Sequence, residues 1–269
     1  MSIYPKILLL LSCYALSLPL AARPSKTGRG NGWKFSNERH DSNFFIQQEI
    51  TQKPRGIYLS IGGDRAIQDA VYAKEAGMDI QGVIHVDRDS DVLMFALTLK
   101  NILIGSNTRS QFVGRLFSQF RLLSRLYYGI FFLAYPHPQS IYFNDQQYQK
   151  AKNLLQEAFQ LQFQVDLNDE TTWGPLFAAI KERGLPIAVF DISNVLGGYV
   201  RKKEVKKFIE HLYPEYMGEE SLFVSTQFCL REHHAKTQVM PISTALERLD
   251  LPDFRAHHND PMCASLEEL

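Results

Sequence analysis

The chain has 269 residues, and its 29 basic and 29 acidic side chains give a formal net charge of zero. This balance argues against a protein that holds nucleic acid or an anionic membrane mainly through its overall charge. The hydrophobic content of 45% is ordinary for a globular protein, and the length suffices for one well-buried domain beside a leader and a loose arm.

Residues 1–22 have the pattern of a secretory signal peptide. Lys6 supplies a positive start, the apolar run from Ile7 to Leu20 follows, and small residues end the segment at Ala22. The run is short for a transmembrane helix, and Pro19 interrupts it. We expect export with cleavage, which leaves a periplasmic or secreted protein without a membrane span; the alternative is an uncleaved membrane anchor.

The three cysteines do not form a disulfide framework. Loss of the leader removes Cys13 and leaves Cys229 and Cys263, which either pair in an oxidising compartment or stay as free thiols, the state we favour. No Cys-x-x-Cys motif occurs, so a zinc ribbon or thiol-redox role is not indicated. The histidine pairs His233-His234 and His257-His258 are interpreted as solvated loop residues, and no metal is expected.

A polar arm over residues 23–54 precedes a pattern of strand, glycine turn, helix, strand and acid. The elements are, in order, Ile57–Ile61, Gly62-Gly63-Asp64, Ala66–Ala76, Gly82–Val86 and Asp87. Small residues in such a turn let the backbone approach a ligand, and the following helix offers free N–H groups. This order therefore indicates a site for an adenosine-containing cofactor.

Strands and helices continue to alternate after this unit. The pattern predicts a helix around 92–103, a helical insertion at 111–143, a helix over 145–161, a strand over 163–167, a helix over 173–183, a strand over 187–192, a helix over 205–213 and a strand over 222–228. We therefore predict an α/β fold with a doubly wound, mainly parallel sheet and helices on both faces. The predicted domain covers 55–230, and 231–269 is interpreted as a C-terminal extension.

The glycine turn differs from the dinucleotide-binding pattern. That pattern needs a third glycine, whereas Asp64 follows Gly62 and Gly63 here. A carboxylate at this position is unfavourable beside a pyrophosphate and favourable beside a cationic ligand such as S-adenosylmethionine. The alternative is a tight structural turn without a ligand.

Four further polar residues lie at or just after the ends of predicted strands. Asp87 is placed to bind a ribose diol, and Asp166 is placed to contact an adenine amino group. Asp191 and Asn194 are candidates for orienting a substrate amine or hydroxyl, because ligands bind beyond the carboxyl ends of such strands. The alternatives are a loop acid at 87, a loop or capping acid at 166, and a capped turn after 191.

The segments GIYLSIGGDRAIQDA, VDRDSDV, VDLND and DISNVLGGYV resemble S-adenosylmethionine-dependent methyltransferase-like proteins of bacteria over residues 55–230. The resemblance implies a Rossmann-like methyltransferase fold, S-adenosylmethionine as cofactor, and a Ser-Asn segment at Ser193-Asn194 after the fourth strand. Ser60 stands where the family often has an acid. The turn is also similar to that of polyamine synthases, which implies aminopropyl transfer as an alternative.

Two classes of function remain open from the sequence. One is an exported methyltransferase that acts on an unidentified acceptor. The other is a non-catalytic secreted effector or envelope interaction module on the same fold, which binds a protein partner. The insertion at 111–143 is the expected seat of specificity in the first case.

Overall fold

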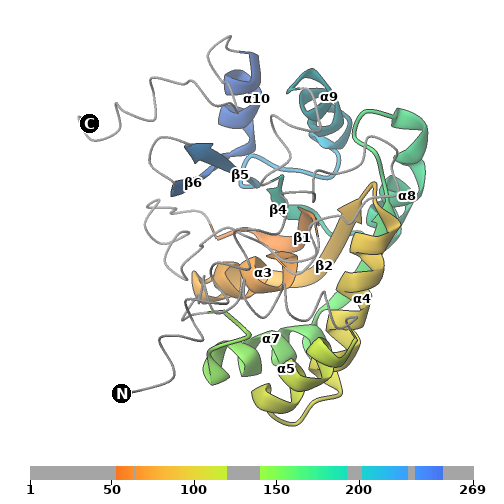
Figure 1. Cartoon of the computed structure of the whole chain (residues 1–269). Coiled ribbons are helices and arrows are strands. Elements are labelled where there is room, and N and C mark those ends of the chain that lie inside the picture. The colour runs from red at the N-terminus through yellow and green to blue at the C-terminus, as the bar shows by residue number, and fades with distance from the viewer. Residues whose placement is uncertain (1–52, 63–64, 120–139, 193–201, 230–233, 251–269) are drawn as a thin grey trace. The chain divides into compact units, whose positions relative to one another are not determined.

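The computed structural model describes residues 53–62, 65–119, 140–192, 202–229 and 234–250 (Figure 1). Six strands form one sheet in the order β3-β2-β1-β4-β5-β6. Their bounds are β1 Arg55–Ile61, β2 Asp79–Asp87, β3 Phe159–Gln164, β4 Ile187–Asp191, β5 Leu222–Cys229 and β6 His234–Pro241. The first five strands are parallel, and β6 is antiparallel to β5. The predicted doubly wound, mainly parallel α/β sheet is confirmed.

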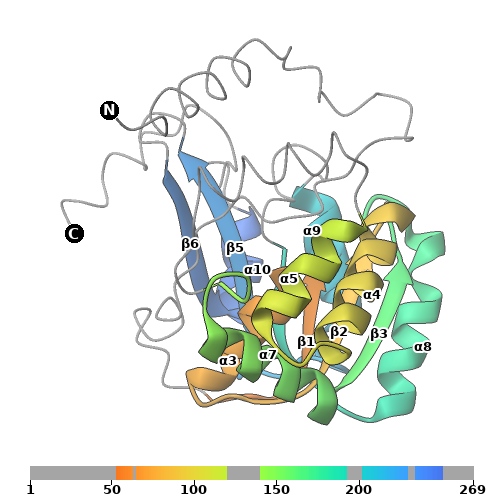
Figure 2. The ribbon, with the colours of Figure 1, turned by 60° about the horizontal axis from the view of Figure 1, so that its bottom comes forward.

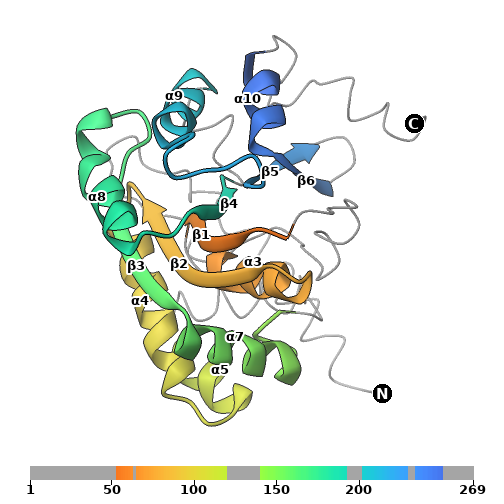
Figure 3. The same cartoon turned by 180° about the vertical axis from the view of Figure 1, so that it is seen from behind.

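Helices cover both faces of this sheet. They are α3 Arg65–Glu75, α4 Ser90–Ile104, α5 Arg109–Ser118, α7 Asp145–Glu157, α8 Gly174–Arg183, α9 Lys202–Leu212 and α10 Ile242–Asp250, with a 3-10 turn, η1, at Glu170–Thr172. Figure 3 shows α9 and α10 on one side of the sheet and α3, α5 and α7 on the other.

Each face buries its own hydrophobic core, because successive strand residues point to opposite sides. Tyr58, Val83 and Val189 pack with α3, α4, α5 and α7. Leu59 and Phe190 pack with α8, α9 and α10 on the opposite face. Burial on both faces explains why β4 is apolar up to its last residue and why three apolar residues follow one another in the middle of β1.

The start of β3 corrects the predicted helix over 145–161 and the predicted strand over 163–167. Helix α7 ends at Glu157, Ala158 already has an extended backbone, and β3 begins at Phe159. In the strand sequence FQLQFQ, every second residue is apolar, and these residues pack against one core. This two-residue period outweighs the helical stripe on which the longer helix was based.

The segment expected as a C-terminal extension contributes to the same sheet. β6 pairs with β5 along eight registered positions, from Leu222 opposite Pro241 to Cys229 opposite His234. Ile242 and Ala245 of α10 are buried in the core shared with α8 and α9. The α/β domain therefore continues beyond the predicted boundary at 230 and includes β6 and α10. The strand was missed because half of its residues are polar and it lacks a continuous apolar run.

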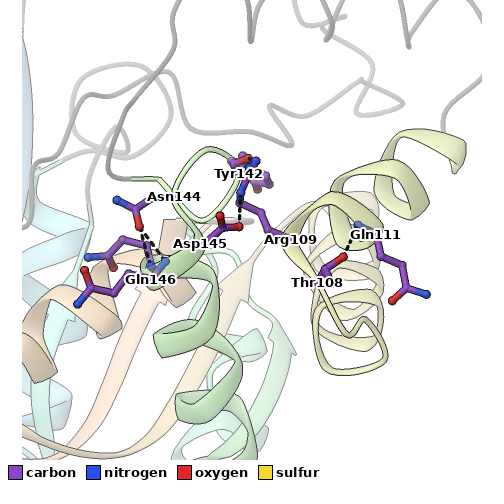
Figure 4. Close-up of polar contacts among 8 residues, drawn as sticks. Thr108, Arg109, Gln111, Tyr142, Asn144, Asp145 and Gln146 are labelled. Atoms are coloured by element: carbon purple, nitrogen blue, oxygen red, sulfur yellow. Dashed lines mark hydrogen bonds and ion pairs between the residues drawn. The ribbon is translucent and has the colours of Figure 1, made fainter.

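The described parts of the predicted insertion at 111–143 flank a polar junction between α5 and α7 (Figure 4). The Arg109 guanidinium donates to the Tyr142 carbonyl at 2.9 Å and to Asp145 Oδ1 at 2.8 Å. The Thr108 and Asn144 side chains cap the two helices. Residues 120–139 lie outside the described part of the chain. Among the helices that are described, none has the length and apolar character needed to span a bilayer.

Replacement of Gly82 by alanine should destabilise the sheet at the β2–β3 contact. An added Cβ lies 2.2 Å from the Phe159 ring, which Arg183 covers at 4.8 Å from its centroid. Overpacking of this kind costs about 1–3 kcal/mol. Urea unfolding measures the loss. Gly174→Ala is the control, because no atom lies within 4 Å of its Cβ; equal stability of the two variants would contradict the expected clash.

Candidate functional site

Four of the predicted site residues lie at or just beyond the carboxyl ends of the neighbouring strands β3, β2, β1 and β4. These strand ends together form the carboxyl edge of the sheet. The Gly62 amide donates to the Val86 carbonyl at 3.1 Å, and the Val165 amide donates to the Asp87 carbonyl at 3.0 Å. Asp191 pairs in register with Ser60 of β1. The parallel strands β3, β2, β1 and β4 lie side by side (Figure 2). Their carboxyl ends thus bring Gly62, Asp87, Asp166 and Asp191 to the same edge.

The strand order reverses between β1 and β4 at this edge. In open α/β sheets, ligands commonly bind outside the carboxyl ends of the strands at such a switch point. Gly62 ends β1 there and leads toward α3, whose N-terminus presents backbone N–H groups. The described topology therefore provides a ligand position next to the predicted glycine turn.

Gly62 has the backbone freedom and the space that a ligand-binding turn requires. Its φ of +124° is a conformation that residues with a side chain rarely adopt. A Cβ built at this position meets no atom of the described residues within 4 Å, so the backbone is open to that side of the described structure. Gly63 and Asp64, the other two predicted members of the turn, lie outside the described residues.

Asp87 is a mostly buried carboxylate at the end of β2. Burial raises its pKa to about 6, and the nearby Asp89 carboxylate adds to the rise. The Asp89 amide donates to Asp87 Oδ1 at 2.8 Å, and this hydrogen bond lowers the pKa in part. The ionised carboxylate is therefore incompletely solvated near neutral pH, which favours a ligand that offers further donors.

Asp166 organises the loop that follows β3. Its Oδ1 atom accepts hydrogen bonds from the backbone amide and the side-chain amide of Asn168, and its carbonyl accepts from the Trp173 indole. Asp169, not Asp166, caps the 3-10 turn η1. The loop role that the sequence left open for Asp166 is thus observed. The predicted contact with adenine stays a prediction.

Asp191 lies in a buried polar cluster. Its Oδ2 atom accepts a hydrogen bond from the Tyr58 hydroxyl at 3.0 Å and lies 3.7 Å from Arg65 Nε. Arg65 also contacts Asp69 Oδ2 at 2.5 Å, one helical turn along α3. Burial and the two carboxylates raise the pKa of Tyr58 well above its ordinary value, so its hydroxyl stays a donor.

The sequence did not indicate this cluster as a unit. Tyr58 lies in an apolar strand, and Arg65 and Asp69 have the four-residue spacing of an ordinary helical ion pair. That spacing was the only signal available, and it is common on exposed helix surfaces. The predicted partner of Asp191, Asn194, lies outside the described residues.

Ser60 and His85 occupy the same row of the sheet as Asp191. Ser60 pairs in register with His85 on one side and with Asp191 on the other. Both side chains are buried, and the Ser60 hydroxyl has no hydrogen-bond partner among the described residues. A buried hydroxyl of this kind is suited to a water or ligand group at the edge of the sheet.

The side chains that the structure describes include no group of three or more histidine, cysteine or acidic residues arranged to hold a metal ion. The described side chains at the edge include carboxylates, a hydroxyl and the His85 imidazole. Such groups recognise a polar organic ligand through hydrogen bonds.

No protein-family model matches the chain, and none of the curated proteins matches it. Eleven chains of solved structures match it in fold. One is the rRNA methyltransferase aviRa from Streptomyces viridochromogenes, with a TM-score of 0.41 and 12% sequence identity over 84% of this chain and 96% of that chain.

Replacement of Asp87 by asparagine should stabilise the protein above pH 6. A carboxyl pKa raised from 3.8 to about 6 in the folded state means that ionisation opposes folding. This contribution is absent below about pH 4 and reaches at most about 3 kcal/mol above pH 6. We expect the stability difference between Asp87→Asn and the parent chain to grow over this range in urea unfolding.

Asp79→Asn is the matched control for this titration. Asp79 begins the same strand but is exposed, and its ion pair with Arg55 lies at the surface. Exposed pairs contribute about 0–1 kcal/mol. An Asp87→Asn difference that stays flat between pH 4 and 7 would show that the Asp87 carboxylate is not desolvated in the fold.

Proposed function

We propose that this domain binds S-adenosylmethionine at the carboxyl edge of its sheet and presents it to a methyl acceptor. One observation carries the proposal. The open, positive-φ Gly62 and the poorly solvated Asp87 end two hydrogen-bonded strands next to the switch point of the sheet. An adenosine-containing ligand needs these two features together, because its backbone contact and its ribose contact come from adjacent strands.

The proposed binding roles follow the order of the strands. Gly62, with Gly63 and Asp64, holds the methionine end next to the N-terminus of α3. Asp87 accepts hydrogen bonds from both ribose hydroxyls, which supplies the donors that its buried carboxylate lacks. Asp166 lies at the end of the next strand, β3, and is proposed to contact the adenine amino group.

The acidic character of the turn favours a cationic ligand over a dinucleotide. Asp64 belongs to the glycine turn, next to the proposed position of the methionine end. A pyrophosphate beside Asp64 would meet its carboxylate, whereas the ammonium group of S-adenosylmethionine is attracted to it. This argument supports S-adenosylmethionine rather than a nicotinamide cofactor.

The bound cofactor supplies an electrophilic methyl group for direct displacement. Such a transfer depends mainly on alignment of the reacting atoms, so the protein needs positioning groups more than an acid–base pair. We propose Asn194 as a residue that faces the acceptor. Asp191 was predicted to share this role, but its carboxylate contacts Tyr58 and Arg65 in the interior, and a different role for it is argued below.

Isothermal titration calorimetry with S-adenosylmethionine and S-adenosylhomocysteine tests the proposal. We expect binding that weakens at least tenfold in Asp87→Ala, because hydrogen bonds to a charged group contribute about 1.5–3 kcal/mol each. Asp79→Ala, at the far end of β2, should bind like the parent chain. No detectable heat at millimolar ligand would remove the proposal and leave the non-catalytic interaction module as the better account.

Ligand affinity should also fall as the pH falls through 6. Only the ionised Asp87 carboxylate accepts both ribose protons, and its pKa in the free protein is about 6. Between pH 7.5 and pH 5 the ionised fraction drops about tenfold, and we expect the affinity to drop with it. An affinity independent of pH over this range would contradict the ribose assignment.

We also propose that the chain is exported, on the strength of the leader sequence at residues 1–22. Exported protein would meet S-adenosylmethionine if it is delivered to a compartment that contains this metabolite. Intact-mass measurement of the protein recovered from its native host should show loss of residues 1–22. Recovery of the chain with Met1 retained would contradict cleavage.

A further inference from the structure

The buried cluster of Tyr58, Arg65, Asp69 and Asp191 combines residues from three elements at the switch point. Tyr58 comes from β1, Asp191 from β4, and Arg65 and Asp69 from α3. Arg65 is 7% exposed, and both aspartates are 0% exposed. One guanidinium therefore lies between two carboxylates in the protein interior.

Buried charges of this kind contribute little net free energy to the packing of a helix against a sheet. Buried ion pairs lose solvation that their mutual attraction only partly restores, and apolar side chains of similar volume often give equal or greater stability. Arg65 also lies in the first turn of α3, where the helix dipole disfavours a cation, and this turn contains no acid. Stability of α3 alone does not account for the cluster.

The contacts connect the first turn of α3 with the end of β4, and both lie next to the proposed site. Arg65 begins α3 only three residues after Gly62, and its Nε atom lies 2.5 Å from Asp69 and 3.7 Å from Asp191. Tyr58 donates to the same Asp191 oxygen from β1. The position of Arg65 therefore ties the first turn of α3 to the end of β4.

We propose that Arg65, Asp69 and Asp191 form a clamp that positions the glycine turn for its ligand. Asp191 is then a positioning residue and does not contact the acceptor. Because ions in a low-dielectric interior interact strongly and tolerate few arrangements, the clamp selects one orientation of the first turn of α3. This inference rests on the proposed function for its ligand, but the clamp itself concerns only the protein.

Asp191→Asn is the sharpest variant for a test. The amide oxygen still accepts a hydrogen bond from Tyr58, and Arg65 keeps Asp69 as a counter-ion, so no lone buried charge is created. Tyr58→Phe is the second variant, because it removes one hydrogen bond to Asp191 without any change of charge. Asp79→Asn at the opposite edge of the sheet is the control, since it removes an exposed carboxylate from the end of β2 remote from the clamp.

Hydrogen exchange of the full chain, without ligand, measures the clamp directly. We expect the amides of Ile67 to Ala70 in α3 to exchange at least tenfold faster in Asp191→Asn and about threefold faster in Tyr58→Phe. The amides of Leu176 to Ile180 in α8, on the other face, should be unchanged, as should all of these amides in Asp79→Asn. Unchanged exchange in α3 would overturn the clamp.

Calorimetry with S-adenosylhomocysteine then separates positioning from direct contact. We expect Asp191→Asn to weaken binding at least tenfold together with the faster exchange in α3. Weaker binding with unchanged exchange would mean that Asp191 contacts the ligand and would overturn the positioning role. If the parent chain itself does not bind, the proposed function fails, while the exchange measurement still decides whether the clamp exists.

Discussion

The arrangement of this domain at its switch point depends on one constraint, which is that the charges buried between α3 and β4 must remain paired. Arg65, Asp69 and Asp191 are almost completely removed from water, and each needs an opposite charge or a hydrogen bond within the protein. In this structure the pairing holds the first turn of α3 beside the end of β4. Gly62 lies only three residues before Arg65 in the chain, so the proposed ligand site lies next to these contacts in sequence.

The chemistry of the carboxyl edge follows from the position of these charges. The clamp lies beneath the edge, on the face covered by α3, whereas Asp87 and Asp166 lie at the ends of the next two strands. Asp87 is less deeply buried than the clamp and has a pKa of about 6. At this edge the clamp supports the first turn of α3, and hydrogen bonds from a ligand would stabilise the ionised Asp87 carboxylate. This combination is what a ribose diol requires.

The alternation of strands and helices was readable from the sequence because two-sided burial makes parallel strands apolar and separates them by amphipathic helices. The edge residues Gly62, Asp87, Asp166 and Asp191 could be brought together for the same reason, since each lies at or next to the carboxyl end of a predicted strand. The start of β3 was misplaced because Ala158 and Phe159 continue the helical stripe of α7 before the backbone extends. β6 was missed because its partner β5, not its own composition, holds it in the sheet.

The clamp could not be predicted from the sequence. Arg65 and Asp69 have a spacing that usually marks an exposed helix surface, and only the approach of β4 makes them interior residues. The role of Asp191 changes for the same reason. A strand-end acid was expected to face the crevice, but alternation along β4 directs its side chain to the face that α3 covers, where Tyr58 and Arg65 meet it.

A crystal structure of the chain with S-adenosylhomocysteine tests the central claim most directly. The account predicts the ligand at the carboxyl edge, with its amino-acid end over Gly62, both ribose hydroxyls within hydrogen-bond distance of the Asp87 carboxylate, and Asp191 still paired with Arg65 beneath it. A ligand bound elsewhere, or a ribose turned away from Asp87, would contradict the account.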